Sequence, residues 1–183
     1  LSDVYRVGER IKVYILSVEK TNKFPKILIS RKNEGLLKKL FEIEIPEITS
    51  GIIEIKSVAR EAGSRAKVAV YSAVPNIDTV GACIGQRGAR IKNIVDELNG
   101  ERIDIVEWKP VVEEFVSAVL SPAVVSNVTI LEDGTARVLV EPSQLSLAIG
   151  KNGQNARLAA RLTGMRVDIK VIDNETLKEE ENE

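Results

Sequence analysis

Two short segments of this chain combine glycine spacing with cationic side chains, a pattern suited to holding phosphate groups. Both have the form Gly-x-x-Gly, and they read Gly85-Gln86-Arg87-Gly88 and Gly150-Lys151-Asn152-Gly153. In each copy an apolar run ending in Ile-Gly leads into the motif, and a helix-like segment follows it. One such motif is a weak signal, but two copies about 65 residues apart in matching contexts indicate an internal repeat.

The glycines explain how such a loop could bind a nucleic-acid backbone. Glycine permits a tight turn, and because it has no Cβ a phosphodiester can approach the main chain closely. The second glycine lies where the next helix begins, so free N–H groups and the positive end of the helix dipole would face an anion. We predict that the binding residues are Gly85, Gln86, Arg87, Gly88, Arg90 and Lys92 in the first copy, and Gly150, Lys151, Asn152, Gly153, Gln154, Asn155 and Arg157 in the second. Bases would pack on aliphatic side chains such as Ile84, Ile91 and Ile149, because the chain is only 4% aromatic and poorly suited to stacking.

A purely structural role for the glycines, or a nucleotide-binding one, fits the sequence less well. Each pair could merely allow two helices to cross closely, but cations in or just after both loops favour binding. A P-loop is excluded because G-x-x-x-x-G-K-[ST] is absent, and a dinucleotide fingerprint is excluded because Gly81, Gly85 and Gly88 lack the G-x-G core.

The same order of elements is predicted around both loops. Hydrophobic periodicity indicates helix, strand, strand, short helix, helix and strand in each copy. In the first copy these elements lie near 36–41, 52–60, 65–73, 80–84, 89–98 and 102–108. In the second they lie near 111–120, 124–131, 136–141, 145–149, 154–163 and 166–171. Asp78 or Thr79 is expected to cap the first short helix. Residues 7–18 and 26–31 precede the repeat as a predicted hairpin, so we predict an α+β protein.

Composition excludes several kinds of enzyme and metal site. The chain has no histidine and one cysteine, which removes imidazole-dependent triads, the commonest metal ligand and zinc-finger spacing. We therefore expect no catalytic residues, no metal site and no cofactor. Residues 173–183 carry a net charge of −5, and subtracting this from the −1 of the whole chain leaves +4 for residues 1–172. No apolar run approaches the roughly 20 residues of a membrane helix and one cysteine forms no internal disulfide, so we expect a cytoplasmic protein.

Longer stretches resemble known families. The α-β-β-α-α-β order with Gly-x-x-Gly between the central helices resembles the prokaryotic-type KH domain. Residues 80–85, 103–106, 144–150 and 153–160 are similar to the NusA family of bacterial transcription factors, and the resemblance covers about residues 5–172. It implies four parts: 1–34 as the C-terminal strands of an OB-type RNA-binding barrel, 35–109 as a first KH domain, 110–172 as a second, and 173–183 as an acidic tail or linker.

The resemblance also implies a function. It predicts a non-enzymatic module that binds nascent single-stranded RNA and modulates RNA polymerase pausing, termination and antitermination. The implied partners are single-stranded RNA, RNA polymerase through the intact protein and other elongation factors, with no membrane partner and a monomeric state. A ribosome-associated or rRNA-assembly KH protein is the alternative, and a scaffold whose grooves hold peptide is a third hypothesis that the basic loops disfavour.

Overall fold

The computed structural model describes residues 4–172, and the predicted acidic tail at 173–183 lies outside them. The chain divides into two compact units, Leu1–Ile105 and Val106–Glu183. Each unit contains one of the two Gly-x-x-Gly motifs. In residues 4–172, no helix combines the length and the apolar character needed to cross a membrane.

The first unit begins with the predicted hairpin. Strands β1 (Tyr14–Glu19) and β2 (Lys26–Ser30) pair antiparallel, with a bulge between Ile15 and Ser17. The apolar side chains of these strands are exposed on both faces: Ile15, Leu16, Val18, Ile27, Leu28 and Ile29. Within the described residues no further strand pairs with β1 or β2, so the OB-type barrel remains a prediction.

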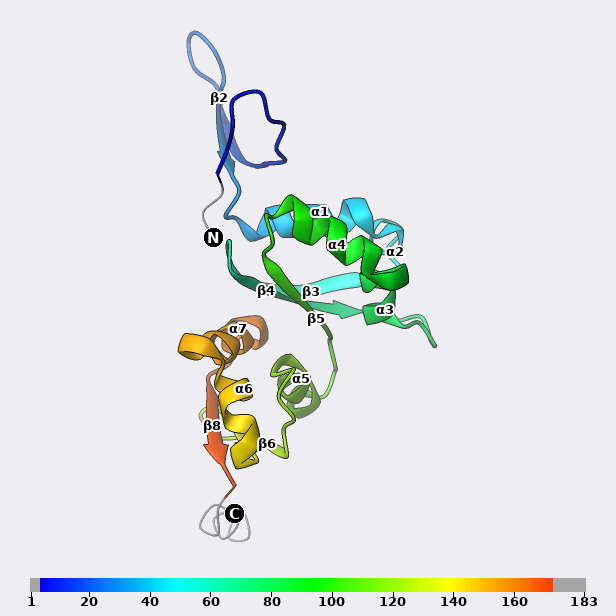
Figure 1. Ribbon diagram of the computed structural model, residues 1–183, viewed down its shortest axis with the longest axis vertical. Coiled ribbons are helices and arrows are strands. Elements are labelled where there is room, and N and C mark those ends of the chain that lie inside the picture. The colour runs from blue at the N-terminus through cyan, green and yellow to red at the C-terminus, as the bar shows by residue number, and fades with distance from the viewer. Residues whose placement is uncertain (1–3, 173–183) are drawn as a thin grey trace. The chain divides into compact units, whose positions relative to one another are not determined.

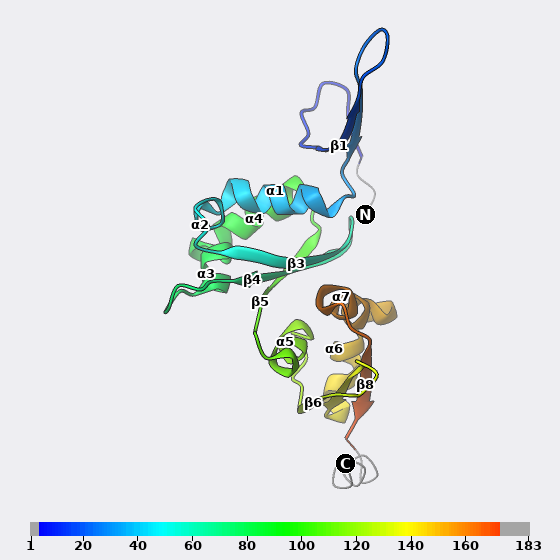
Figure 2. The ribbon, with the colours of Figure 1, turned by 180° about the vertical axis from the view of Figure 1, so that it is seen from behind.

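The rest of the first unit is a three-stranded sheet with helices on one face (Figures 1 and 2). Its elements are α1 (Glu34–Glu44), α2 (Pro46–Thr49), β3 (Glu54–Glu61), β4 (Arg65–Tyr71), α3 (Thr79–Ile84), α4 (Ala89–Glu97) and β5 (Arg102–Glu107). The strand order is β3-β4-β5, and α1 and α4 lie side by side over the sheet.

Helical spacing explains why α1 forms and which face it buries. Leu36 and Leu37 recur four residues later as Leu40 and Phe41, and all four are almost fully buried, which is the stripe of a core-facing helix. Alternate residues of β4, namely Ala66, Val68 and Val70, meet this stripe in one core cluster. Asn33 begins the helix, because its side chain accepts a hydrogen bond from the N–H of Gly35 at 2.7 Å.

The second unit repeats this order. Its elements are α5 (Val112–Val119), β6 (Asn127–Ile130), β7 (Ala136–Val140), α6 (Leu145–Ile149), α7 (Gln154–Thr163) and β8 (Val167–Val171). The strand order is β6-β7-β8, with β6 antiparallel and β8 parallel to β7. The core is formed by Phe115, Val116 and Val119 of α5, Val138 and Val140 of β7, and Leu158 and Leu162 of α7.

The predicted α-β-β-α-α-β order is thus present in both units, with differences at the element ends. Asp78 rather than Thr79 caps α3, because an Asp78 carboxylate oxygen accepts from the N–H of Gly81 at 2.8 Å while Thr79 is buried. Strand β6 starts at Asn127 rather than Val124, because the N–H of Val124 donates to the side chain of Gln144 instead of to a strand. The short helix α2 has no counterpart among the elements predicted from sequence.

Candidate nucleic-acid interface

The two Gly-x-x-Gly loops have nearly the same backbone. The first glycine, Gly85 or Gly150, has φ 77° and ψ 173° or φ 74° and ψ 170°. The second, Gly88 or Gly153, has φ 76° or 72° with ψ 15° in both. These positive φ angles favour glycine over any residue with a side chain, so the sequence motif follows from the shape of the turn.

A third position in each loop is also left-handed, which was not predicted from the sequence. Arg87 has φ 53° and ψ 28°, and Asn152 has φ 54° and ψ 29°. Asparagine tolerates this conformation and arginine does so less readily, at a cost of about 1 kcal/mol or more. The signal that could have suggested it is the asparagine at the third loop position of the second copy.

The structure leaves most of the predicted side chains at the surface. Gln86, Arg87, Lys92, Lys151, Asn152 and Arg157 are exposed, and Gln154 is half-buried. The guanidinium of Arg157 donates to the carbonyl of Asn152 at 3.1 Å, which holds this cation at its own loop. Lys92 forms an ion pair with Asp96 one helical turn later, which offsets its charge.

Two of the predicted binding residues face inward instead. Asn155 is 0% exposed, and its amide donates to the backbone carbonyls of Leu120, Leu147 and Ala148. Arg90 is half-buried, and its guanidinium donates to the carbonyl of Ala82 at 2.6 Å and to Glu47 at 2.8 Å. Direct RNA contact by Asn155 is at odds with this burial, whereas RNA contact by the partly exposed Arg90 stays a prediction.

The helices that follow the loops have N-termini without side-chain caps. Gly88 and Gly153 occupy the cap positions of α4 and α7 and, having no side chain, supply no capping hydrogen bond to the first turn of their helix. This arrangement leaves the positive end of each helix dipole facing an anion at the loop. Ile84 and Ile149, directly before the loops, are each 38% exposed, whereas Ile91 packs against the core.

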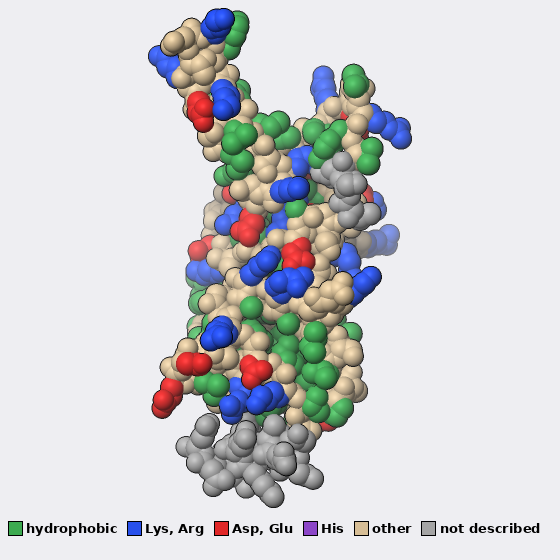
Figure 3. Space-filling view, turned by 90° about the vertical axis from the view of Figure 1, so that its left-hand side faces the viewer, with side chains coloured by type: hydrophobic (Ala, Val, Ile, Leu, Met, Phe, Trp, Pro, Cys, Tyr) green, Lys and Arg blue, Asp and Glu red, His purple; other side chains and the backbone are tan. Residues whose placement is uncertain are grey.

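On the face drawn in Figure 3, Lys and Arg side chains are interspersed with acidic ones rather than gathered into one continuous field. Exposed charges farther apart than about 8 Å are largely screened at physiological salt, so an anion at a loop is attracted mainly by the cations of that loop.

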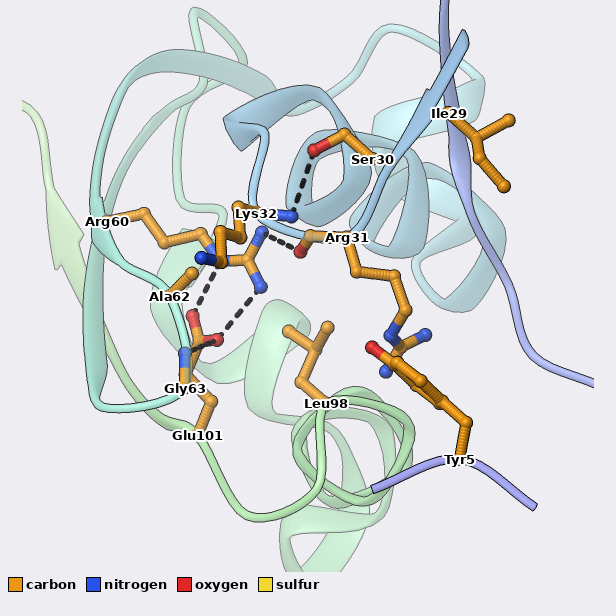
Figure 4. A pocket seen from close by; sticks show the side chains of 10 residues that line it. All are labelled: Tyr5, Ile29, Ser30, Arg31, Lys32, Arg60, Ala62, Gly63, Leu98 and Glu101. Carbon is orange, nitrogen blue, oxygen red and sulfur yellow. Dashed lines mark hydrogen bonds and ion pairs between the residues drawn. The ribbon is translucent and has the colours of Figure 1, made fainter. Parts of the chain in front are cut away.

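A separate cleft of about 750 Å³ lies where the hairpin meets the first sheet. Figure 4 shows Arg60 and Glu101 hydrogen-bonded to each other among the residues that line it. Their side chains form two hydrogen bonds of 2.7 and 2.9 Å, and Arg60 also donates to the carbonyls of Arg31 and Asn33. The buried charges of Arg60 and Glu101 are thus paired with each other. Through its other two hydrogen bonds, Arg60 connects the segment after β2 to the first sheet.

Two further features bear on chemistry. In the described part of the chain, no group of three or more His, Cys, Asp or Glu residues could hold a metal ion. Cys83 is fully buried on α3, and burial raises the pKa of its thiol to about 12, which keeps it protonated and unreactive.

Comparison with known proteins matches both units. Residues 31–108 match the family description NusA-like first KH domain, and residues 112–177 match NusA-like second KH domain. The chain is similar to proteins named transcription termination/antitermination protein NusA. It is 55% identical over 170 residues to that of Bacillus subtilis, covering 92% of this chain and 46% of the relative. It is 46% identical over 179 residues to that of Thermus thermophilus, covering 97% of this chain and 46% of the relative.

The chain spans about half the length of the curated proteins it matches. A solved structure titled "Crystal structure of APE1850" has the same fold, with a TM-score of 0.54 and 22% identity. That similarity covers 72% of this chain and 94% of the other.

Proposed function

The chain belongs to the NusA family through its two KH domains, and we propose that it is a non-enzymatic single-stranded RNA-binding module of a transcription factor. One observation carries the proposal: two loops of nearly identical backbone each present an exposed cation, Arg87 and Lys151, at an uncapped helix N-terminus. That combination suits a phosphodiester in each loop.

The proposed contacts are a subset of those predicted from the sequence. The glycines allow close approach of the RNA backbone, and Arg87, Lys92, Lys151 and Arg157 supply charge. Gln86, Asn152 and Gln154 supply hydrogen-bonding groups that can reach sugars or base edges. Arg90 and Asn155 are left out because their side chains face inward.

The test replaces both exposed loop cations in one variant, Arg87→Asp with Lys151→Asp. Aspartate suits position 87 because it tolerates a left-handed backbone. Each lost charge-assisted contact is worth about 1.5–3 kcal/mol, so affinity for single-stranded RNA should fall by at least about tenfold. The slope of log K against log salt should become shallower by roughly 1.4, or about 0.7 per lost phosphate contact.

The matched control makes the same charge change at exposed lysines away from the loops, Lys38→Glu on α1 and Lys170→Glu on β8. RNA affinity and salt slope should change far less in this control. Circular dichroism checks that both variants are folded. Equal losses in the two variants would mean that RNA responds to net charge alone and would refute the proposed contacts.

We further propose that the intact protein acts with RNA polymerase and other elongation factors on pausing, termination and antitermination, as a cytoplasmic monomer. The support is the name that the relatives carry, transcription termination/antitermination protein. Crosslinking of the intact protein in cells, read out by position on the RNA, distinguishes this role from ribosome assembly. Crosslinks concentrated in nascent transcripts support it, and crosslinks concentrated in rRNA refute it.

A further inference from the structure

The two inward-facing residues occupy equivalent positions in the repeat. Arg90 and Asn155 each lie two residues after the second glycine of their loop. Each also lies directly against the first glycine. A Cβ atom built on Gly85 would be 2.7 Å from the side chain of Arg90, and one built on Gly150 would be 2.8 Å from Cβ of Asn155. The inward residue therefore fills the space that a side chain at the first glycine would occupy.

Both residues also bind the same backbone group. Arg90 donates to the carbonyl of Ala82 at 2.6 Å, and Asn155 donates to that of Leu147 at 3.3 Å. These carbonyls belong to equivalent residues, each three positions before the first glycine, in the helix that enters the loop. Each hydrogen bond therefore ties the start of the helix after the loop to the end of the helix before it.

The second anchor differs between the copies. Arg90 reaches Glu47 on α2, at 2.8 Å between a guanidinium nitrogen and a carboxylate oxygen. Asn155 reaches the carbonyl of Leu120, just after α5, at 3.0 Å. The first contact is a half-exposed ion pair, and the second is a neutral hydrogen bond in a fully buried site.

We propose that Arg90 and Asn155 are positioning residues that brace the two loops from behind, the first through an ion pair with Glu47 and the second through neutral hydrogen bonds. The inference rests on the proposed RNA binding and refines it. Sequence alone groups Arg90 with the RNA-contacting cations. A brace instead sets the fraction of molecules whose loop is ready to bind, and apparent affinity falls in proportion to that fraction.

Removing Glu47 distinguishes the two roles of Arg90, because they predict opposite changes in RNA affinity. If Arg90 contacts phosphate, Glu47→Ala frees its guanidinium and removes a nearby negative charge, so RNA binds more tightly. If Arg90 is a brace, the same change loosens the loop, and affinity for single-stranded RNA falls by about three- to tenfold, the loss of one charge-assisted hydrogen bond at a half-exposed site.

Arg90→Gln adds a second measurement, with Arg87→Gln as the matched variant. Loss of a phosphate contact makes the salt dependence shallower by about 0.7, and we expect this for Arg87→Gln. Arg90→Gln should lower affinity and leave the salt slope unchanged. A slope change of about 0.7 in Arg90→Gln, or tighter RNA binding by Glu47→Ala, would overturn the brace.

The single cysteine supplies a readout that needs no RNA. Cys83 lies fully buried on α3, next in sequence to Ala82, whose carbonyl accepts the hydrogen bond from Arg90. Loosening the brace should speed the reaction of Cys83 with a thiol reagent several-fold in both Glu47→Ala and Arg90→Gln, while Arg87→Gln reacts at the wild-type rate. Unchanged labelling in both brace variants would refute the brace, whereas normal RNA binding by Arg87→Gln would refute the RNA contact and leave the labelling test valid.

Discussion

The buried ion pair between Arg60 and Glu101 allows a quantitative prediction about how the first unit is held together. Their side chains are 3% and 1% exposed, so the pair has little solvent screening. The Glu101 carboxylate accepts three hydrogen bonds, from two nitrogens of Arg60 and from the N–H of Gly63 at 2.9 Å. Glu101→Gln keeps the shape and replaces one accepting oxygen by an NH₂ group that cannot accept.

The expected cost follows from these contacts. At least one donor loses its partner, and the Arg60 charge stays buried without a counter-ion, for which removal of one partner typically costs about 3–5 kcal/mol. We therefore expect the free energy of unfolding to fall by about 3 kcal/mol in Glu101→Gln, measured by urea unfolding followed by circular dichroism. A double variant, Arg60→Met with Glu101→Leu, should lose less than the sum of the single changes, because no buried charge remains.

The control is an exposed pair of the same chemistry. Glu42→Gln removes the carboxylate partner of Lys39 on α1, where both side chains are exposed, and the urea midpoint should not change. A loss below about 1 kcal/mol in Glu101→Gln would refute the reasoning, because it would mean that the buried guanidinium finds another partner.

Three further predictions concern the loops and the buried thiol. Gly150→Ala should lower the melting temperature more than Gly85→Ala, since the new Cβ meets a backbone atom, the N of Asn155, at 2.8 Å in the first case and only side-chain carbons of Arg90 in the second; equal shifts in calorimetry would contradict this. Arg87→Asn should raise the free energy of unfolding by about 1 kcal/mol by relieving the left-handed backbone while weakening RNA binding, and a destabilised variant in urea unfolding would argue against strain. The pKa of Cys83 is raised from 9.0 to about 12, so its thiol stabilises the fold below pH 9, and that stability is lost as pH rises toward 12. The difference in unfolding free energy between the wild type and Cys83→Ala should thus fall by at most about 1.4 kcal/mol per pH unit above 9, and a flat difference would contradict the shift.

The order of elements could be predicted from sequence because it is encoded locally. Leu36, Leu37, Leu40 and Phe41 follow helical spacing, and the structure buries all four in α1. The tight turns at the two Gly-x-x-Gly motifs could also be predicted, since a positive φ at a tight turn favours glycine. Periodicity and turn chemistry act over a few residues, so one sequence contains their signal.

The inward residues could not be predicted because their partners are distant in sequence. Arg90 and Lys92 are both cations at the start of the same helix, but Arg90 contacts Glu47, 43 residues earlier, and the carbonyl of Ala82, whereas Lys92 pairs with Asp96. Asn155 is buried because it meets the carbonyl of Leu120, 35 residues away. Lys67 is a similar case: alternation on β4 puts it on the face away from the core, yet it is fully buried and paired with Asp104 on β5.

The contacts that hold the hairpin have a consequence for how the chain folds as it is synthesised. Arg31, directly after β2, donates to the backbone and carboxylate of Glu97, which lies 66 residues later. Arg60 holds the carbonyls of Arg31 and Asn33, but its counter-ion Glu101 follows another 41 residues on. Because a ribosome releases the chain from its N-terminus, the hairpin emerges before any residue that anchors it. The ion pair with Glu97 and the complete Arg60–Glu101 pair can therefore form only after α4 and the residue before β5 have left the ribosome.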